Sequence, residues 1–168
     1  MPEQVEARYN AAFRKGWTVF LGAWVAVGAV MLVAGIALMW PPLRVLGVSH
    51  LAVFLPLLVY ARVRMASPLP VISIGPQGFL DSRLGTPVPW REITWLRRQI
   101  SGSRIILQIE VDAPERFLKR TGLVPLLMRW LNPKMGFPVL GSNLSGMDVP
   151  QERIAAAAEG WWEAARAG

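Results

Sequence analysis

The chain has 168 residues, of which 53% are hydrophobic, and its 18 Lys and Arg outnumber its 11 Asp and Glu to give a net charge of +7. It contains no cysteine and one histidine, His50. This composition excludes disulfides and thiol chemistry, and it leaves a soluble part without His-dependent triads or clustered His metal sites.

The first apolar run, Trp17–Trp40, contains no charged side chain. As a helix it would reach about 36 Å, which is enough to cross a hydrocarbon core of about 30 Å with some tilt. Arg8, Arg14 and Lys15 before it would also fit a cleaved signal peptide. The run is longer than a signal-peptide core, however, and no small-residue cleavage site follows it. We therefore expect a retained membrane helix.

A second apolar run, Leu43–Tyr60, is shorter and contains Arg44, His50 and Pro56. We expect Pro56 to kink this helix and the Arg44 side chain to reach the outer headgroups. An intramembrane histidine can be a proton or ligand site. For His50, which has no acidic partner in either run, we favour a role in helix pairing or a place near the interface.

The basic residues around these runs predict their orientation. Three bases precede the first run and Arg62 and Arg64 follow the second, whereas the connection between the runs offers only Arg44, at the very start of the second run. By the positive-inside rule both termini should be cytoplasmic, so the chain is expected to be a multi-pass protein of the inner (cytoplasmic) membrane. Small residues would allow the two helices to approach closely, and the helix-pairing candidates are Gly22, Ala26, Gly28 and Gly35.

The pattern changes after a linker at Ser67–Pro70, and strands are predicted from there on. The predicted strands are Val71–Ile74, Phe79–Ser82, Thr94–Ile100, Arg104–Val111 and Phe137–Leu140, and a short helix is expected at Pro114–Arg120. In Arg104–Val111 apolar and polar residues largely alternate, which is typical of a half-buried antiparallel strand.

The C-terminal segment is predicted to be an amphipathic helix. Asp148 is a candidate N-cap, with Gln151 at the capping-box position. An apolar stripe follows at helical spacing, formed by Ile154, Ala157, Ala158, Trp161, Trp162 and Ala165. We expect Trp161 to be buried in the core, as we do Trp90; stacking on a ligand is the alternative for the tryptophan pair of the stripe.

Two segments resemble bacterial pleckstrin-homology-like (PH-like) domains. Val71–Phe79 looks like their opening, and Val88–Ile93 is similar to their I-P-W-x-x-I element. Asp112–Phe117, followed by a basic-apolar insertion, a strand and a helix, resembles a family of small, largely uncharacterised bacterial membrane proteins. Members of that family carry two transmembrane helices before a PH-like domain.

The resemblance implies an α+β fold, in which a transmembrane hairpin precedes a PH-like antiparallel β domain closed by a C-terminal amphipathic helix. The expected organisation is a cytoplasmic N-terminal segment (1–16), the hairpin (17–62) and a cytoplasmic PH-like domain (67–168). The motifs of the family are structural, so the resemblance implies no catalytic residue.

The segment Leu123–Leu131 combines bulky apolar residues with nearby bases, a pattern that suits a membrane interface. The membrane-surface candidates are Leu123, Val124, Leu127, Arg129, Trp130 and Lys134. The alternative is that these side chains pack on the sheet.

No nucleophile–base pair, carboxylate pair or metal-ligand cluster stands out, so we expect a non-enzymatic protein without cofactor. One hypothesis is a binding or scaffolding module at the cytoplasmic face of the inner membrane. The other is an accessory subunit of a larger membrane complex, such as a transporter, that packs through its hairpin. The expected partners are the lipid bilayer and a membrane or cytoplasmic protein. Nucleic acid is not expected, because the bases are scattered.

Overall fold

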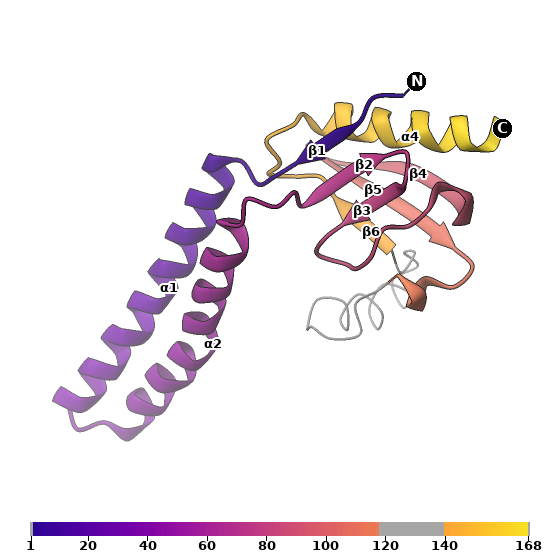
Figure 1. Ribbon diagram of the computed structural model, residues 1–168. Coiled ribbons are helices and arrows are strands. Elements are labelled where there is room, and N and C mark those ends of the chain that lie inside the picture. Colours follow the sequence, from indigo (N-terminus) through magenta and orange to yellow (C-terminus); the bar gives the residue numbers. More distant parts are fainter. Residues whose placement is uncertain (1, 118–139, 168) are drawn as a thin grey trace. The chain divides into compact units, whose positions relative to one another are not determined.

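A computed structural model describes residues 2–117 and 140–167. The chain divides into two compact units, one made of Met1–Arg8 and Leu69–Gly168 and the other of Tyr9–Pro68. The described part contains two long N-terminal apolar helices, two antiparallel sheets and a C-terminal helix (Figure 1). The expected α+β class is therefore confirmed.

The unit Tyr9–Pro68 is a helical hairpin of α1 (Ala11–Ala37) and α2 (Pro41–Met65). α1 begins before the predicted Trp17 because Asn10 caps it: the Asn10 Oδ1 accepts a hydrogen bond of 2.7 Å from the Phe13 N–H. Asparagine is a preferred N-cap, and its bond satisfies one of the free N–H groups of the first turn. α2 begins with two prolines, where a missing N–H costs no helical bond, and it extends beyond the predicted Tyr60.

The turn between the helices is a Schellman motif built on a non-glycine residue. Met39 has a positive φ of 52°, while the Trp40 N–H donates to the Gly35 carbonyl at 2.9 Å and the Met39 N–H to the Ile36 carbonyl at 3.2 Å. The Arg44 Nε donates to the same Gly35 carbonyl at 2.9 Å. Arg44 thus lies at the negative end of the α1 dipole.

The other unit holds two three-stranded antiparallel sheets, ordered β1-β2-β3 and β4-β5-β6. Short 3₁₀ turns, η1 (Trp90–Glu92) and η2 (Pro114–Arg116), lie before β4 and after β5. The strands are β1 (Val5–Ala7), β2 (Ile72–Gly75), β3 (Gly78–Asp81), β4 (Ile93–Ser101), β5 (Arg104–Val111) and β6 (Leu140–Asn143).

β1 is a strand that the sequence pattern does not predict, because three residues are too few to show alternation. It pairs antiparallel with β2, with Val5 opposite Ile74 and Ala7 opposite Ile72. Val5 and Ala7 are both buried. The helical hairpin is therefore connected at its two ends to neighbouring strands of one sheet.

The predicted strands match the sheets closely. β5 has the predicted bounds, and its buried residues alternate as expected. The first two predicted strands are shifted by about one residue, because Gly75 pairs with Gly78 across a two-residue turn. The described strand β6 begins at Leu140, and residues 137–139 lie outside the described part. Of the predicted helix at 114–120, the 3₁₀ turn η2 is described.

The C-terminal helix α4 (Gln151–Ala167) packs against both sheets and η1 (Figure 1). Its buried residues are Ile154, Ala155, Ala157 and Ala158. The prediction that Trp161 is buried is wrong: it is half-buried, and its Nε1 donates to the Glu3 carbonyl at 2.8 Å. Ala165 is exposed, as are all residues from Glu163 to Ala167. Within the described part of the chain, the last turn of the apolar stripe therefore extends beyond the sheets and packs against neither of them.

Asp148 does not cap α4. The first bonds of this helix go from the Arg153 and Ile154 N–H groups to the Pro150 carbonyl. The Asp148 Oδ1 instead accepts from the Arg8 N–H at 2.7 Å, and the Asp148 N–H donates to the Arg8 carbonyl at 2.8 Å. Asp148 therefore holds the backbone at Arg8, immediately after β1, by two hydrogen bonds.

Candidate partner-binding and helix-pairing surfaces

Trp90 fixes the start of β4 from inside the core. It is 5% exposed, as predicted, and its indole Nε1 donates to the Gly75 carbonyl at 2.7 Å. Ile93, three residues later, is also buried. These two anchors hold the chain at the point where η1 passes into β4.

An irregularity in the register then turns Trp95 outward. Ile93 pairs with Val111, but the next residue of β5, Glu110, pairs with Trp95 rather than Thr94. One extra residue on β4 is a β-bulge, and it exchanges the two faces of the strand beyond it. Without this bulge the alternation would direct Trp95 toward the same side as Ile93.

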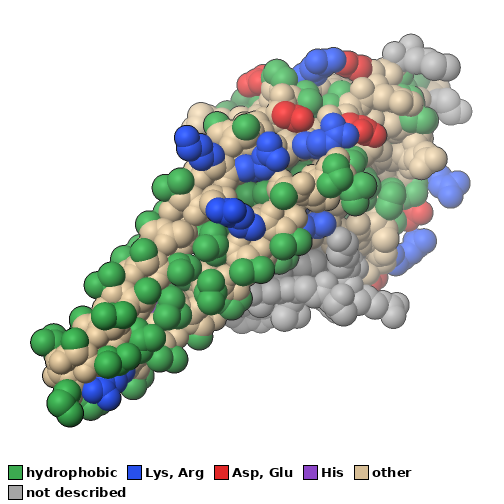
Figure 2. Space-filling view, turned by 60° about the vertical axis from the view of Figure 1, so that its left-hand side comes forward, with side chains coloured by type: hydrophobic (Ala, Val, Ile, Leu, Met, Phe, Trp, Pro, Cys, Tyr) green, Lys and Arg blue, Asp and Glu red, His purple; other side chains and the backbone are tan. Residues whose placement is uncertain are grey.

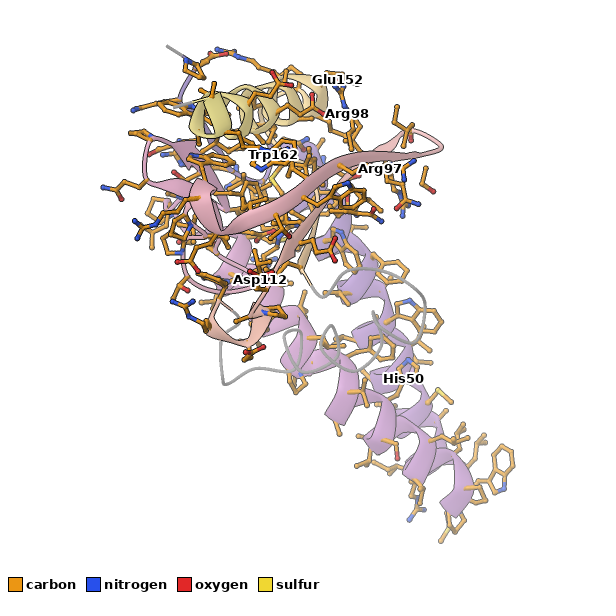
Figure 3. The ribbon with its side chains drawn as sticks, turned by 90° about the vertical axis from the view of Figure 1, so that its right-hand side faces the viewer. His50, Arg97, Arg98, Asp112, Glu152 and Trp162 are labelled. Atoms are coloured by element: carbon orange, nitrogen blue, oxygen red, sulfur yellow. The ribbon has the colours of Figure 1, made fainter. Side chains whose placement is uncertain are left out.

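The residues beyond the bulge form what we name the β4 outer face, defined by Trp95, Arg97, Gln99, Ile106 and Gln108. Trp95 is 37% exposed, and the Arg97 guanidinium lies over its ring at 5.9 Å from the centroid. The Gln108 side chain donates to Gln99, and Ile106 is half-buried. Figure 3 shows Arg97 on the side of β4 away from α4.

The opposite side of β4 is fastened to α4. Arg98 forms an ion pair with Glu159, in which the Arg98 Nη2 lies 2.8 Å from the carboxylate. The Trp162 Nε1 donates to the Ile93 carbonyl at 3.0 Å, and both side chains lie beside the helix in Figure 3. Of two successive arginines, Arg98 is therefore a structural residue, while Arg97 belongs to the outer face.

A buried carboxylate joins the two sheets. Asp81 in β3 is 4% exposed, and its Oδ2 accepts from the Ser142 hydroxyl in β6 and from Arg83 Nη2, both at 2.6 Å. Arg83 Nη2 also reaches the Asn143 carbonyl at 2.9 Å. Paired and hydrogen-bonded in this way, the charge meets the conditions for burial, so this network holds the sheets together.

The helix-pairing candidates divide between two faces of α1. A Cβ on Gly28 would lie 3.2 Å from the His50 Cβ, and one on Gly35 would lie 2.7 Å from the Arg44 N, so both glycines lie against α2. A Cβ on Gly22 would have no heavy atom within 4 Å, and Ala26 is exposed. This second pair therefore leaves a face of small residues that α2 does not cover.

Gly47 in α2 was not among the candidates, yet it has the tightest approach between the helices. A Cβ there would lie 2.5 Å from the Leu32 N. In a run with a single glycine the sequence carries no repeated small-residue pattern, which is why it was missed.

His50 lies in an aromatic cluster of the hairpin (Figure 3). Its ring centroid is 4.6 Å from that of Phe54 and 5.4 Å from that of Trp24, and Trp24 stacks on Phe54 at 5.4 Å. In the described part of the chain the buried Nε2 has no hydrogen-bond partner. A series of ring contacts continues from the cluster along α1 to Tyr9, which precedes the helix; its members are Tyr9, Phe13, Trp17, Phe20 and Trp24.

The membrane-surface candidates of the segment 123–134 lie outside the described residues. Within residues 2–117 and 140–167, no group of three or more acidic or histidine side chains has the arrangement of a metal site. Comparisons with protein-family models, curated protein sequences and solved structures found no significant match.

Proposed function

We propose that this chain is a membrane-anchored, non-enzymatic binding module at the cytoplasmic face of the bacterial inner membrane. In this proposal a PH-like domain docks a protein partner through the β4 outer face. The arrangement of two antiparallel sheets with a C-terminal helix supports the PH-like assignment.

The anchoring part of the proposal is supported by the character of the hairpin. Both α1 and α2 are long and apolar enough to cross a membrane, and hydrophobic side chains are spread along the whole visible surface of the hairpin (Figure 2). Outward-facing apolar side chains of this density suit a lipid environment. Because β1 pairs with β2, residues on both flanks of the hairpin belong to one folded unit, which supports placing both flanks on the same side.

The observation that carries the partner-binding proposal is the outward Trp95 with Arg97 above its ring. Tryptophan and arginine are the residue types most enriched where alanine substitution costs the most binding energy. A bulge directs Trp95 outward although inward packing would bury a large apolar area. Such a placement favours a surface that is covered by a partner.

Site-specific photo-crosslinking in cells tests this surface. A photoreactive residue at Gln99, on the same β4 outer face as Trp95, should give a discrete protein adduct in membranes. The adduct should disappear with Trp95→Ala, and a probe at the exposed Ala164 of α4 should not give it. An adduct that persists at full yield in folded Trp95→Ala protein would contradict the proposal.

An accessory subunit that packs through its hairpin is the second candidate. The uncovered small residues Gly22 and Ala26 favour it, because small residues spaced by four let another helix approach closely. A photoreactive residue at Ala26 should then crosslink to a membrane protein, with the exposed Val63 of α2 as the matched control position. An adduct from Ala26 together with none from Gln99 would support this function over the first.

Reporter fusions test the orientation. Fusions after residue 66 and at the C-terminus should both show cytoplasmic activity, as the bases flanking the helices predict. Activity of an export-dependent reporter at either point would reverse the assignment.

A further inference from the structure

A pocket of about 330 Å³ lies between the start of α1 and the end of α2, entirely within the hairpin unit. A water molecule needs only about 10–15 Å³ by the same measure, so the pocket has room for a much larger group. Small side chains line it from both helices: Ala11 from α1 and Ala61 from α2.

Three bases line this pocket. Arg14 and Lys15 come from α1 and Arg62 comes from α2, and the described lining includes no acidic residue. Three cations brought together from two helices, without a lining carboxylate, favour an anionic occupant. A hydroxyl, that of Thr18, supplies a hydrogen-bond donor beside them.

The remaining wall of the pocket is apolar. Val19 and Met65 contribute to the lining, along with the alanines. A free inorganic anion would gain nothing from these side chains, whereas the glycerol and upper acyl carbons of a lipid would bury apolar surface against them. Basic pockets between transmembrane helices at the cytoplasmic side are a known way of holding anionic headgroups.

We infer that this pocket binds the phosphodiester headgroup of an anionic phospholipid, with Arg14 and Arg62 as the ligands from the two helices. The inference rests on the membrane insertion in the proposed function, and it is independent of the protein partner. Bridging both helices, a bound lipid holds the open end of the hairpin together, opposite the turn that Arg44 closes.

Native mass spectrometry of the full chain in a neutral detergent tests this inference. The probes are phosphatidylglycerol, neutral phosphatidylcholine and water-soluble glycerol phosphate. The wild-type chain should retain phosphatidylglycerol in preference to phosphatidylcholine. The double variant Arg14→Gln/Arg62→Gln should bind it about 30-fold more weakly, at about fivefold for each base near the headgroup.

The matched control is Arg91→Gln/Arg104→Gln, which removes the same charge from exposed positions of the folded domain. It should bind phosphatidylglycerol like the wild type. The inference would be overturned if both double variants lost phosphatidylglycerol binding equally, or if the wild type retained both lipids equally. Binding of glycerol phosphate as tight as that of the lipid would replace it with a simple anion site.

Carbonate extraction of membranes distinguishes failure of the lipid-site inference from failure of the proposed membrane anchor. A chain that stays in the membrane pellet but shows no lipid preference refutes only the lipid site. A chain that is extracted refutes the membrane anchor, and with it the lipid site as well.

Discussion

Trp90 shows how one side chain combines packing with a directed hydrogen bond. Trp90→Ala should lower the free energy of unfolding of the domain by about 3–5 kcal/mol, as expected for an aromatic residue removed from a core. Trp90→Phe keeps most of the volume but loses the bond to the Gly75 carbonyl, and it should cost about 1 kcal/mol for that bond. Urea denaturation in mild detergent measures both, and equal midpoints for wild type and Trp90→Ala would contradict the burial.

Gly78 has no room for a side chain. Its φ is +136°, and a Cβ there would lie 2.1 Å from the Val88 carbonyl oxygen. Gly78→Ala should therefore break the bridge between Phe79 and Val88 and strongly lower the urea midpoint. The control is Gly102→Ala in the β4–β5 turn, where φ is +59° and space is open, so only the left-handed backbone cost of about 1–2 kcal/mol applies. A smaller effect at Gly78 than at Gly102 would refute this account.

At the scale of elements, β1 is held by its strand pairing with β2 and by an ion pair between Glu3, just before the strand, and Arg153 of α4. The Arg153 guanidinium, hydrogen-bonded to the Glu3 carboxylate, lowers the Glu3 pKa below its ordinary value. A carboxylate whose pKa is lowered by folding stabilises the fold above its unfolded pKa, about 4.3, and loses that contribution as pH falls through the folded value. Both groups are exposed, so the effect is small.

The difference in thermal midpoint between wild type and Glu3→Gln should accordingly be constant above about pH 5 and should shrink as the pH falls below the unfolded pKa of about 4.3. Glu163→Gln, on an exposed turn of α4, is the control and should show no such difference. A gap between wild type and Glu3→Gln that widens as the solution is acidified would exclude the proposed ion pair.

The hairpin depends on contact between backbones at particular glycines. Gly47→Val should separate α1 from α2, because its Cβ would meet the Leu32 backbone, whereas Gly22→Val should leave the hairpin intact. Titration with dodecyl sulfate, which dissociates weakly packed helices, should unfold Gly47→Val at a lower detergent fraction than Gly22→Val. The reverse order would mean that α1 presents its other face to α2.

The helices and strands that were predicted from sequence are those with a clear local pattern. The boundaries and caps that were not predicted have physical causes. Alternation predicts β5, and apolar length predicts α1 and α2. The start of α1 depends on an Asn10 cap that hydropathy ignores. Asp148 has a capping side chain, but its bond goes to Arg8, a residue 140 positions away, and local patterns contain no such partner.

The candidate surface was harder to predict than the fold. Alternation alone would place Trp95 on the inner side with Ile93, and only the bulge at Thr94 reverses this. Similarly, the pocket between the helices needs Arg14 and Arg62 to meet from distant parts of the sequence. The outward position of Trp95 depends on strand register and the pocket depends on helix packing, and neither can be inferred from a local sequence pattern.

At the scale of the whole molecule, the folded domain requires residues from both sides of the hairpin. A fragment beginning at residue 69 lacks Val5, which is 4% exposed in the intact chain, and it leaves the β2 edge without its partner. Burial of one valine alone contributes about 1.5–3 kcal/mol. The fragment should thus unfold at lower urea than one in which residues 2–8 are joined to residue 69 by a flexible Gly/Ser linker. The control is the same linked protein with Val5→Ser and Ala7→Ser in residues 2–8, and it should not regain stability.

The insertion of the hairpin between two paired strands also sets an order for biosynthesis. β1 leaves the ribosome first, and β2 follows only after the residues of Tyr9–Pro68 have been made, which takes roughly 3–12 s at about 5–20 residues per second. During that interval β1 has to wait unpaired. If one helix alone crosses the bilayer, the two strands finish in different compartments and the sheet never closes. In the proposed membrane anchor, the sheet can therefore close only in copies whose two flanks reach the same side of the bilayer, and other copies leave the edge of β2 unpaired.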